Sequence, residues 1–127
     1  DLKNMVFVGI RRRGVPLAQR LADIIEKYEH IKCPVGEVDI AMYRDDLDPS
    51  QLNIKVQAQQ LPVDVTGRTV VLVDDVLATG GTLRAALSLA RLQGATVIGA
   101  AVLVELPALG GRARWDADAP LHVALQG

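Results

Sequence analysis

Residues 70–82 read VVLVDDVLATGGT, and this stretch decides the fold of the chain. Its apolar beginning predicts a strand at residues 69–73 that is buried on both faces. Two carboxylates, Asp74 and Asp75, follow at the end of this strand, and a loop of small residues then leads into a helix. A buried strand that is followed directly by a helix is typical of an α/β protein with a parallel sheet.

The loop at residues 78–82 has the composition of a phosphate-binding site. Its two glycines let the backbone approach an anion closely, and its two threonines add hydroxyl donors. The N-terminus of the next helix adds partial positive charge. Because Asp74 and Asp75 would repel a phosphate, we expect them to face sugar hydroxyls or a metal-bound water. The stretch therefore predicts a sugar-phosphate site, and the plainer alternative is a helix start with two ordinary turn residues.

The rest of the chain continues the alternation of strands and helices. The apolar runs and periodicities predict strands at 5–10, 35–43, 95–104 and 121–125, helices at 15–29 and from 83 to Gly94, and an exposed strand or ribbon at 54–59. Together they predict one domain, residues 1–127, with a mostly parallel twisted sheet flanked by helices. Ligands bind such sheets at the carboxyl ends of the strands. We therefore expect residues 11–14 and 74–82 to face one crevice.

Composition excludes several classes of protein. A net charge of −1 argues against a strongly basic nucleic-acid binder, and 3% aromatic residues argue against a base-stacking platform. Cys33 is the only cysteine, which excludes a disulfide within the chain and a cysteine-based zinc site, and we expect it to be a buried structural thiol. No apolar run reaches the ~18 residues of a membrane helix, and no signal peptide is visible. We expect a soluble, cytoplasmic protein with no membrane partner.

The strand, the acidic pair, the TGGT loop and the helix together resemble the phosphoribosyl pyrophosphate (PRPP) signature of type I phosphoribosyltransferases. The resemblance covers most of the chain and divides between two branches of the family. Residues 7–76 resemble the pyrimidine-operon attenuator/uracil phosphoribosyltransferase, through VGI at 8–10, RG at 13–14, YRDDL at 43–47 and LPVDVT at 61–66. Residues 77–112 resemble adenine phosphoribosyltransferase, through LATGGT at 77–82, VEL at 104–106 and GGR at 110–112. A divergent natural enzyme, a recombined chimera and a designed sequence each explain such a join.

The resemblance implies transfer of a 5-phosphoribosyl group from PRPP to uracil or adenine, with release of pyrophosphate. The transition state is oxocarbenium-like, so catalysis depends on positioning and electrostatics, and Mg²⁺ bridges pyrophosphate and ribose hydroxyls. The reaction is promoted by Asp74, Asp75 and Arg13, and the two acids face the ribose hydroxyls directly or through water on Mg²⁺. The residues implied to bind the 5′-phosphate are Ala78, Thr79, Gly80, Gly81 and Thr82. The residues implied to bind the pyrophosphate are Arg11, Arg12, Arg13, Gly14 and, from the family's mobile loop, Arg44.

Some features depart from the family pattern and keep alternatives open. Ala78 stands where relatives carry a carboxylate or a tyrosine, so we expect no general base from this loop. The base-recognition residues of both branches are missing, and we expect the hood to be reduced or missing. Glu105 is interpreted as a surface acid. The alternatives are a non-catalytic, PRPP-responsive RNA-binding regulator of pyrimidine genes, and an engineered or recombined scaffold without turnover. The resemblance also implies a homodimer.

Overall fold

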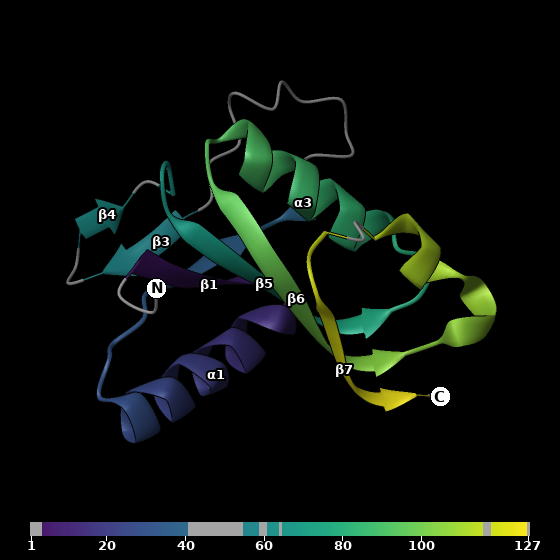
Figure 1. The fold of residues 1–127 in the computed structure, drawn as a ribbon, viewed down its shortest axis with the longest axis horizontal. Helices are drawn as coiled ribbons and strands as arrows, with labels where there is room; N and C mark the ends of the chain where they lie inside the picture. Colours follow the sequence, from purple (N-terminus) through teal and green to yellow (C-terminus); the bar gives the residue numbers. More distant parts are fainter. Residues whose placement is uncertain (1–3, 41–54, 59–60, 64, 116–117, 127) are drawn as a thin grey trace.

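A twisted sheet forms the centre of the molecule, and helices cover both of its faces (Figure 1). The computed structural model describes residues 4–40, 55–58, 61–63, 65–115 and 118–126. The elements are β1 Met5–Ile10, α1 Gly14–Glu29, β2 Val35–Val38, β3 Lys55–Ala58, β4 Leu61–Val63, β5 Thr69–Leu77, α3 Gly81–Leu92, β6 Thr96–Glu105, the 3-10 helices η3 Pro107–Leu109 and η4 Gly111–Arg114, and β7 Leu121–Gln126.

The strand order confirms the predicted mostly parallel sheet flanked by helices. The strands lie in the order β4-β3-β2-β1-β5-β6-β7. The five strands from β2 to β7 in this order are parallel, whereas β3 and β4 form an antiparallel ribbon on β2, as predicted near residues 54–59. The chain passes from β1 to β2 on one side and later to β5 on the other. The order therefore reverses between β1 and β5, and ligands of α/β sheets bind at such a point.

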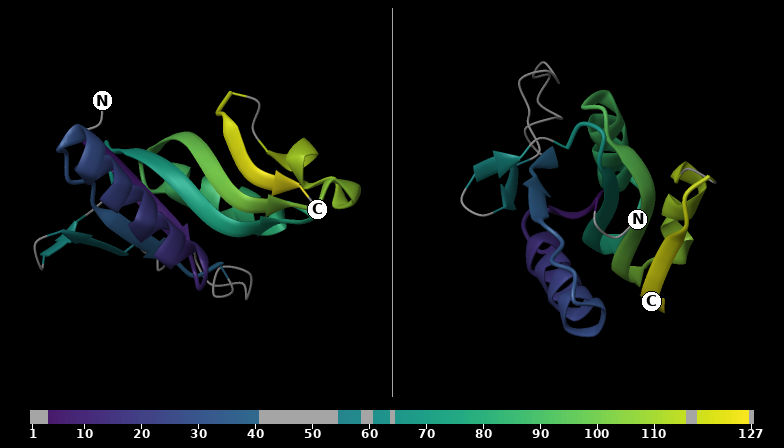
Figure 2. Two further views of the ribbon diagram at one scale, coloured as in Figure 1. Left: turned by 90° about the horizontal axis from the view of Figure 1, so that it is seen from below. Right: turned by 60° about the vertical axis from the view of Figure 1, so that its left-hand side comes forward.

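The two helices pack on opposite faces of the sheet, as both views of Figure 2 show. On one face, the apolar stripe of α3 joins a buried cluster that includes Val8, Leu72 and Ala100 of the central strands. On the other face, α1 buries the small residues Ala18 and Ala22 in a second cluster. Burial of apolar surface in these two layers is the main force that holds the helices to the sheet.

The burial of individual side chains tests the predictions for the helix α1 and for the thiol of Cys33. Of the apolar positions predicted for α1, Ile24 and Tyr28 are 50% and 70% exposed. The predicted positions Leu17, Leu21 and Ile25 pack partly buried against the cluster, and the buried side chains of the helix are the small residues Ala18 and Ala22. Cys33 is buried in the same cluster as Phe7, as predicted for a structural thiol, and burial raises the pKa of that thiol.

Two strand boundaries were predicted wrongly. The strand predicted at 35–43 ends at Val38. The strand predicted at 69–73 continues to Leu77, so that the acidic pair lies inside β5. The reason is that β5 pairs with β1 only as far as Val73 but pairs with β6 through Leu77. Asp74 is therefore level with Ile10, the last residue of β1, and Asp75 lies past it, while β6 continues to pair with this part of β5. None of the helices in the described part of the chain has the length and hydropathy of a membrane span.

Candidate functional site

The acidic pair is held rigidly by its own backbone. Asp74 is only 7% exposed, whereas Asp75 is partly exposed. The N–H of Asp75 donates to Asp74 Oδ1 over 2.8 Å, and the N–H of Val76 donates to Asp75 Oδ1 over 2.9 Å. Burial raises the pKa of Asp74 to about 7, and the hydrogen bond and negative charge of the Asp75 side chain act in the same direction. Near neutral pH the site therefore contains a carboxyl that both accepts and releases a proton.

The start of α1 lies directly on the backbone that carries this pair. A Cβ atom on Gly14 would overlap the carbonyl oxygen of Val73 and lie 3.3 Å from the Cα atom of Asp74. Only glycine permits this approach. Arg13 Nη1 then lies 3.9 Å from Asp75 Oδ2, although the Arg13 side chain is 85% exposed. Such a long, solvated ion pair contributes little to stability, so the Arg13 side chain is available to another anion.

The other two arginines of this loop are exposed as well. The N–H of Arg11 donates to the carbonyl oxygen of Val38 over 2.9 Å, which fixes the loop to the end of β2. The Arg11–Arg12 peptide bond is cis, and the side chains of both residues face solvent. The structure thus brings residues 11–14 and the acidic pair together, as the sequence predicts.

Residues 78–82 follow β5 at the same edge of the sheet. Thr79 is exposed, and the other four residues are partly exposed. Gly80 has a φ angle of 89° and forms the N-cap of α3 without a side-chain hydrogen bond to the helix. Its carbonyl oxygen accepts from the N–H of Arg84 over 2.9 Å. The N–H groups of a first helical turn lack partners inside the helix, and this helix start is accessible to an anion.

The rear of this loop lies against η4. A Cβ atom on Gly80 would lie 2.6 Å from the carbonyl oxygen of Gly111 and 3.2 Å from the Cβ atom of Arg114. A Cβ atom on Gly111 would overlap the carbonyl oxygen of Ala78 and lie 2.9 Å from the Gly80 nitrogen. Two backbones therefore touch with no side chain between them. The sequence analysis did not identify this contact, although the pair of glycines at 110–111 was a possible signal.

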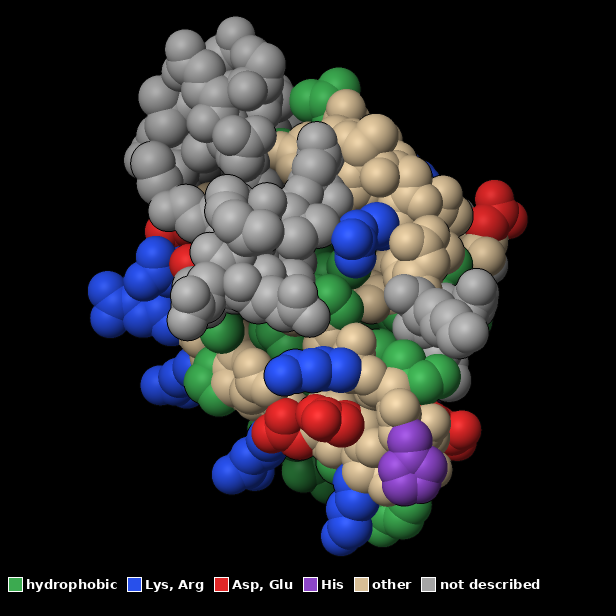
Figure 3. All heavy atoms as spheres, turned by 90° about the vertical axis from the view of Figure 1, so that its left-hand side faces the viewer, with side chains coloured by type: hydrophobic (Ala, Val, Ile, Leu, Met, Phe, Trp, Pro, Cys, Tyr) green, Lys and Arg blue, Asp and Glu red, His purple; other side chains and the backbone are tan. Residues whose placement is uncertain are grey.

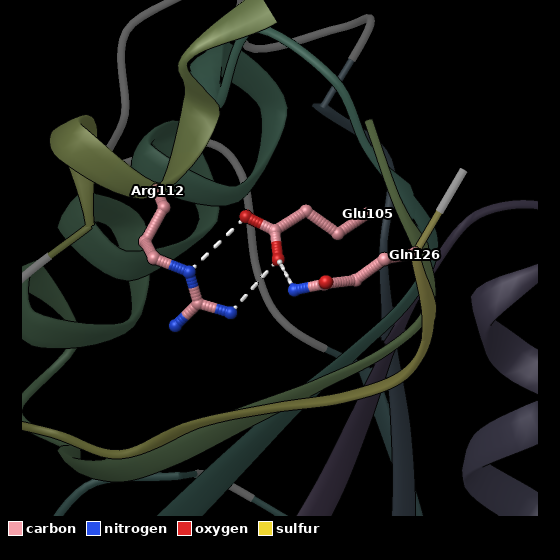
Figure 4. A network of polar contacts seen from close by, with 3 residues as sticks. All are labelled: Glu105, Arg112 and Gln126. Atoms are coloured by element: carbon pink, nitrogen blue, oxygen red, sulfur yellow. Dashed lines mark hydrogen bonds and ion pairs between the residues drawn. The ribbon is translucent and has the colours of Figure 1, made fainter. Parts of the chain in front are cut away.

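Glu105, Arg112 and Gln126 form a polar network, which Figure 4 shows, and in it the Glu105 carboxylate is buried while the Arg112 side chain is 51% exposed and Gln126 is exposed. Glu105 is 4% exposed, so its interpretation as a surface acid was wrong. The Arg112 guanidinium donates from Nε to Oε2 over 3.1 Å and from Nη2 to Oε1 over 2.9 Å. Gln126 Nε2 donates to Oε1 over 3.1 Å. The hydrogen bonds from Arg112 hold the pKa of Glu105 below its ordinary value.

The carboxylates of the site are compatible with Mg²⁺ that arrives with a phosphorylated substrate. The described residues contain no group of three or more His, Cys, Asp or Glu side chains that would hold a metal ion by themselves. Mg²⁺ usually keeps several waters and binds through one or two carboxylates together with substrate phosphates. The adjacent carboxylates of Asp74 and Asp75 supply this donor set. Arg44 lies outside the described residues.

Charge elsewhere on the surface is mixed. On the face drawn in Figure 3, Lys and Arg side chains lie apart from one another and are interspersed with Asp and Glu side chains. This arrangement agrees with the formal net charge of −1 for the whole sequence.

The chain is similar to known proteins of the phosphoribosyl transferase domain family. The family model for the phosphoribosyl transferase domain matches residues 1–119. A protein of Chloroflexus aurantiacus named bifunctional protein PyrR is 51% identical over 105 residues, which are 82% of this chain and 58% of that protein. The protein of the same name from Gloeothece citriformis is 48% identical over 123 residues, which are 96% of this chain and 64% of that protein.

The chain is also similar in fold to solved structures of phosphoribosyltransferases. The crystal structure of adenine phosphoribosyltransferase from Rhodothermus marinus superposes with a TM-score of 0.68 at 29% identity, and the match covers 100% of this chain and 72% of that one. The matches to the two PyrR proteins cover less than two thirds of the length of each of those proteins.

Proposed function

Because the chain belongs to the phosphoribosyl transferase domain family, we propose that it binds PRPP and transfers the 5-phosphoribosyl group to a nucleobase with release of pyrophosphate. The observation that carries the proposal is the meeting of three features at the carboxyl ends of β1 and β5. These features are the arginine loop at 11–14, the pair Asp74–Asp75 and the glycine loop at 78–82. Each suits one part of PRPP.

The glycine loop binds the 5′-phosphate in this proposal. Backbone N–H groups at the start of α3, the partial positive charge of the helix end and the hydroxyls of Thr79 and Thr82 serve as donors. The acidic pair faces the ribose. Its carboxylates accept hydrogen bonds from the ribose hydroxyls, and their negative charge stabilises the positive charge that develops on the sugar in the transition state.

The arginine loop binds the pyrophosphate. Arg13 and Asp75 are close enough to contact the same substrate molecule. The exposed guanidinium of Arg13 neutralises charge on the pyrophosphate leaving group. Mg²⁺, when it is bound with PRPP, adds further neutralisation of the pyrophosphate charge. Ala78 carries no group that accepts a proton, so positioning and electrostatics provide the catalysis from this side of the site. We propose that residues 1–127 act as one such domain and pair as a homodimer.

The acceptor base is proposed to be uracil or adenine, on the basis of the two branches of relatives. The test is calorimetric titration with PRPP and Mg²⁺, followed by assays of pyrophosphate release with each base. We expect saturable PRPP binding that is lost when EDTA is added and weakened by the double substitution Asp74→Asn/Asp75→Asn. Unchanged PRPP affinity in the double variant would contradict the role of the acidic pair. PRPP binding with no pyrophosphate release on any base would support a scaffold without turnover.

A second proposal is a PRPP-responsive RNA-binding regulator of pyrimidine genes. It is favoured by similarity to relatives that are named bifunctional, and by the three consecutive exposed arginines at 11–13. The formal net charge of −1 counts against it. RNA binding whose affinity falls steeply with salt and changes with PRPP would support this role. Its absence in filter-binding assays at low salt would leave the transferase proposal alone.

A further inference from the structure

The position of η4 determines the position of the glycine loop. The contact between Gly80 and Gly111 joins backbone to backbone, and the Ala78 carbonyl lies against the Cα atom of Gly111. A flexible side chain yields when its neighbour moves, but two packed backbones move together. A displacement of η4 would therefore displace the carbonyl and N–H groups of the loop by a similar amount.

Packing alone does not hold η4 in place. It is a single 3-10 turn of four residues, and such short turns are not stable by themselves. Gly111 is buried, but residues 112–114 are exposed, so this turn buries little apolar surface. What fixes it is the two-pronged ion pair of Arg112 with the buried carboxylate of Glu105. A fork of this kind defines direction as well as distance.

The anchor of this ion pair is itself fixed at the level of the loop. Glu105 is the register partner of Leu77, the last residue of β5 before the loop begins. The N–H of Leu106 donates to the carbonyl oxygen of Leu77 over 2.9 Å. Gln126 of β7 adds a third hydrogen bond to the Glu105 carboxylate from the other side. Glu105 is thus held at the point where the glycine loop starts, by the backbone pairing of β6 with β5 and by the hydrogen bond from β7 to its carboxylate.

We propose that Glu105, Arg112 and Gln126 are positioning residues for 5′-phosphate binding, which act on the glycine loop through Gly111. This inference rests on the proposed function, because it takes residues 78–82 as the 5′-phosphate site. It adds a set of residues that touch no substrate and yet set the geometry of the loop that does.

The test uses two probes that separate the two loops. Ribose 5-phosphate carries the phosphate that the glycine loop binds, whereas magnesium pyrophosphate binds the arginine loop. For Gly111→Ala and for Arg112→Gln we expect ribose 5-phosphate affinity to fall about tenfold, which is about 1.4 kcal/mol. Pyrophosphate affinity is expected to stay within about twofold. Arg112→Lys keeps the charge without the fork and should recover only part of the loss.

Gly110→Ala is the matched control. A Cβ atom on Gly110 would meet nothing within 4 Å, although the φ angle of 72° makes the substitution strained. This control strains the segment without a new contact with the glycine loop. The affinities for ribose 5-phosphate and for pyrophosphate should therefore both stay within about twofold. The combination of Gly111→Ala with Arg112→Gln should lose little more affinity than Gly111→Ala alone, because both act through one contact.

Amide resonances of residues 78–82 provide a readout that does not depend on ligand. We expect them to shift in Arg112→Gln and not in Arg20→Gln, which replaces an exposed arginine of α1. Absence of ribose 5-phosphate binding by the unchanged protein would refute the proposed function, while shifted amides would still show that η4 positions the loop. Unshifted amides, or an equal loss of both ligands in Gly111→Ala and Arg112→Gln, would overturn the inference.

Discussion

Replacement of Asp74 by asparagine should stabilise the protein at alkaline pH. Burial raises the pKa of Asp74 from 3.8 to about 7, so the folded state holds this proton more tightly than the unfolded state does. The contribution of Asp74 to stability is therefore complete below pH 3.8 and is lost as the pH rises towards 7. The introduced asparagine side chain has the shape of the protonated acid, its Oδ1 atom still accepts from the N–H of Asp75, and it does not titrate.

The magnitude follows from the two pKa values. The shift lowers the free energy of unfolding by about 4 kcal/mol at pH 8 and by about 2 kcal/mol at pH 5, relative to a pH at which Asp74 is protonated in both the folded and the unfolded state. The unchanged protein should therefore lose about 2 to 3 kcal/mol of its free energy of unfolding between pH 5 and pH 8 that Asp74→Asn does not lose. This change is a large fraction of the stability of an ordinary domain, which is about 5–15 kcal/mol.

Urea unfolding at pH 5 and pH 8 in the presence of EDTA measures this difference. Trp115 is the only tryptophan, and its fluorescence is a suitable probe because its indole packs against the core and donates to the carbonyl oxygen of Ala119. Asp23→Asn, which changes an exposed carboxylate on α1 and keeps Asp74, is the control and should lose the same free energy of unfolding between pH 5 and pH 8 as the unchanged protein. The pKa of Glu105 is lowered and that of Cys33 is raised, so both groups titrate outside this window.

Equal differences between Asp74→Asn and the unchanged protein at pH 5 and pH 8 would refute the reasoning. Such a result would mean that burial does not bias Asp74 towards its neutral form. A difference of the opposite sign would mean that a positive group stabilises the ionised acid in the folded state.

Three further substitutions test other parts of the site. Gly14→Ala should lower the free energy of unfolding by about 2–3 kcal/mol and abolish pyrophosphate binding, because the new Cβ atom would overlap the backbone of β5. Gly67→Ala is the control, since its Cβ atom would lie in open space, and it should lower the free energy of unfolding by only about 1 kcal/mol because of its positive φ angle. Equal costs would contradict the close packing at Gly14. Arg13→Ala should weaken pyrophosphate binding about tenfold in calorimetry with almost no change in stability, since its ion pair is long and exposed. A large loss of stability would show that the arginine is structural. The lowered pKa of Glu105 means that its contribution to stability is present above pH 4.5 and is lost as the pH falls through the folded-state pKa. The unchanged protein should therefore lose stability on acidification, and Glu105→Gln should not show this loss. Parallel acid-unfolding curves for the two proteins would contradict the ion pair.

The sequence predicted most of the sheet because its central strands are apolar runs without polar interruption. β1 and the first part of β5 lie between two layers, so their sequences are apolar on both faces, and β6 is an equally apolar run although Ile98 and Leu103 are exposed. The end of β5 was missed because local composition does not show which strand continues beside it. Asp74 and Asp75 interrupt the apolar run, yet pairing with β6 keeps them extended.

The site was predictable in the parts that are contiguous in sequence. The acidic pair and the glycine loop are one stretch, and the chemistry of each residue type indicates its role. The support behind the loop was not predictable in this way. Glu105 and Arg112 are separated by the 3-10 turn η3 and the start of η4, and no periodicity links residues across such irregular backbone. A buried acid at the end of an apolar strand is compatible with many partners, and only the fold selects one.

The contact between Gly80 and Gly111 has a consequence for how this sequence can exchange segments with its relatives. The two halves of the contact lie on either side of α3 and β6 in the sequence. A crossover before residue 77 inherits the loop and its support as a matched pair. A crossover between residues 82 and 105 would unite backbones that were shaped for different neighbours, and such a hybrid should fold with its phosphate cradle out of register.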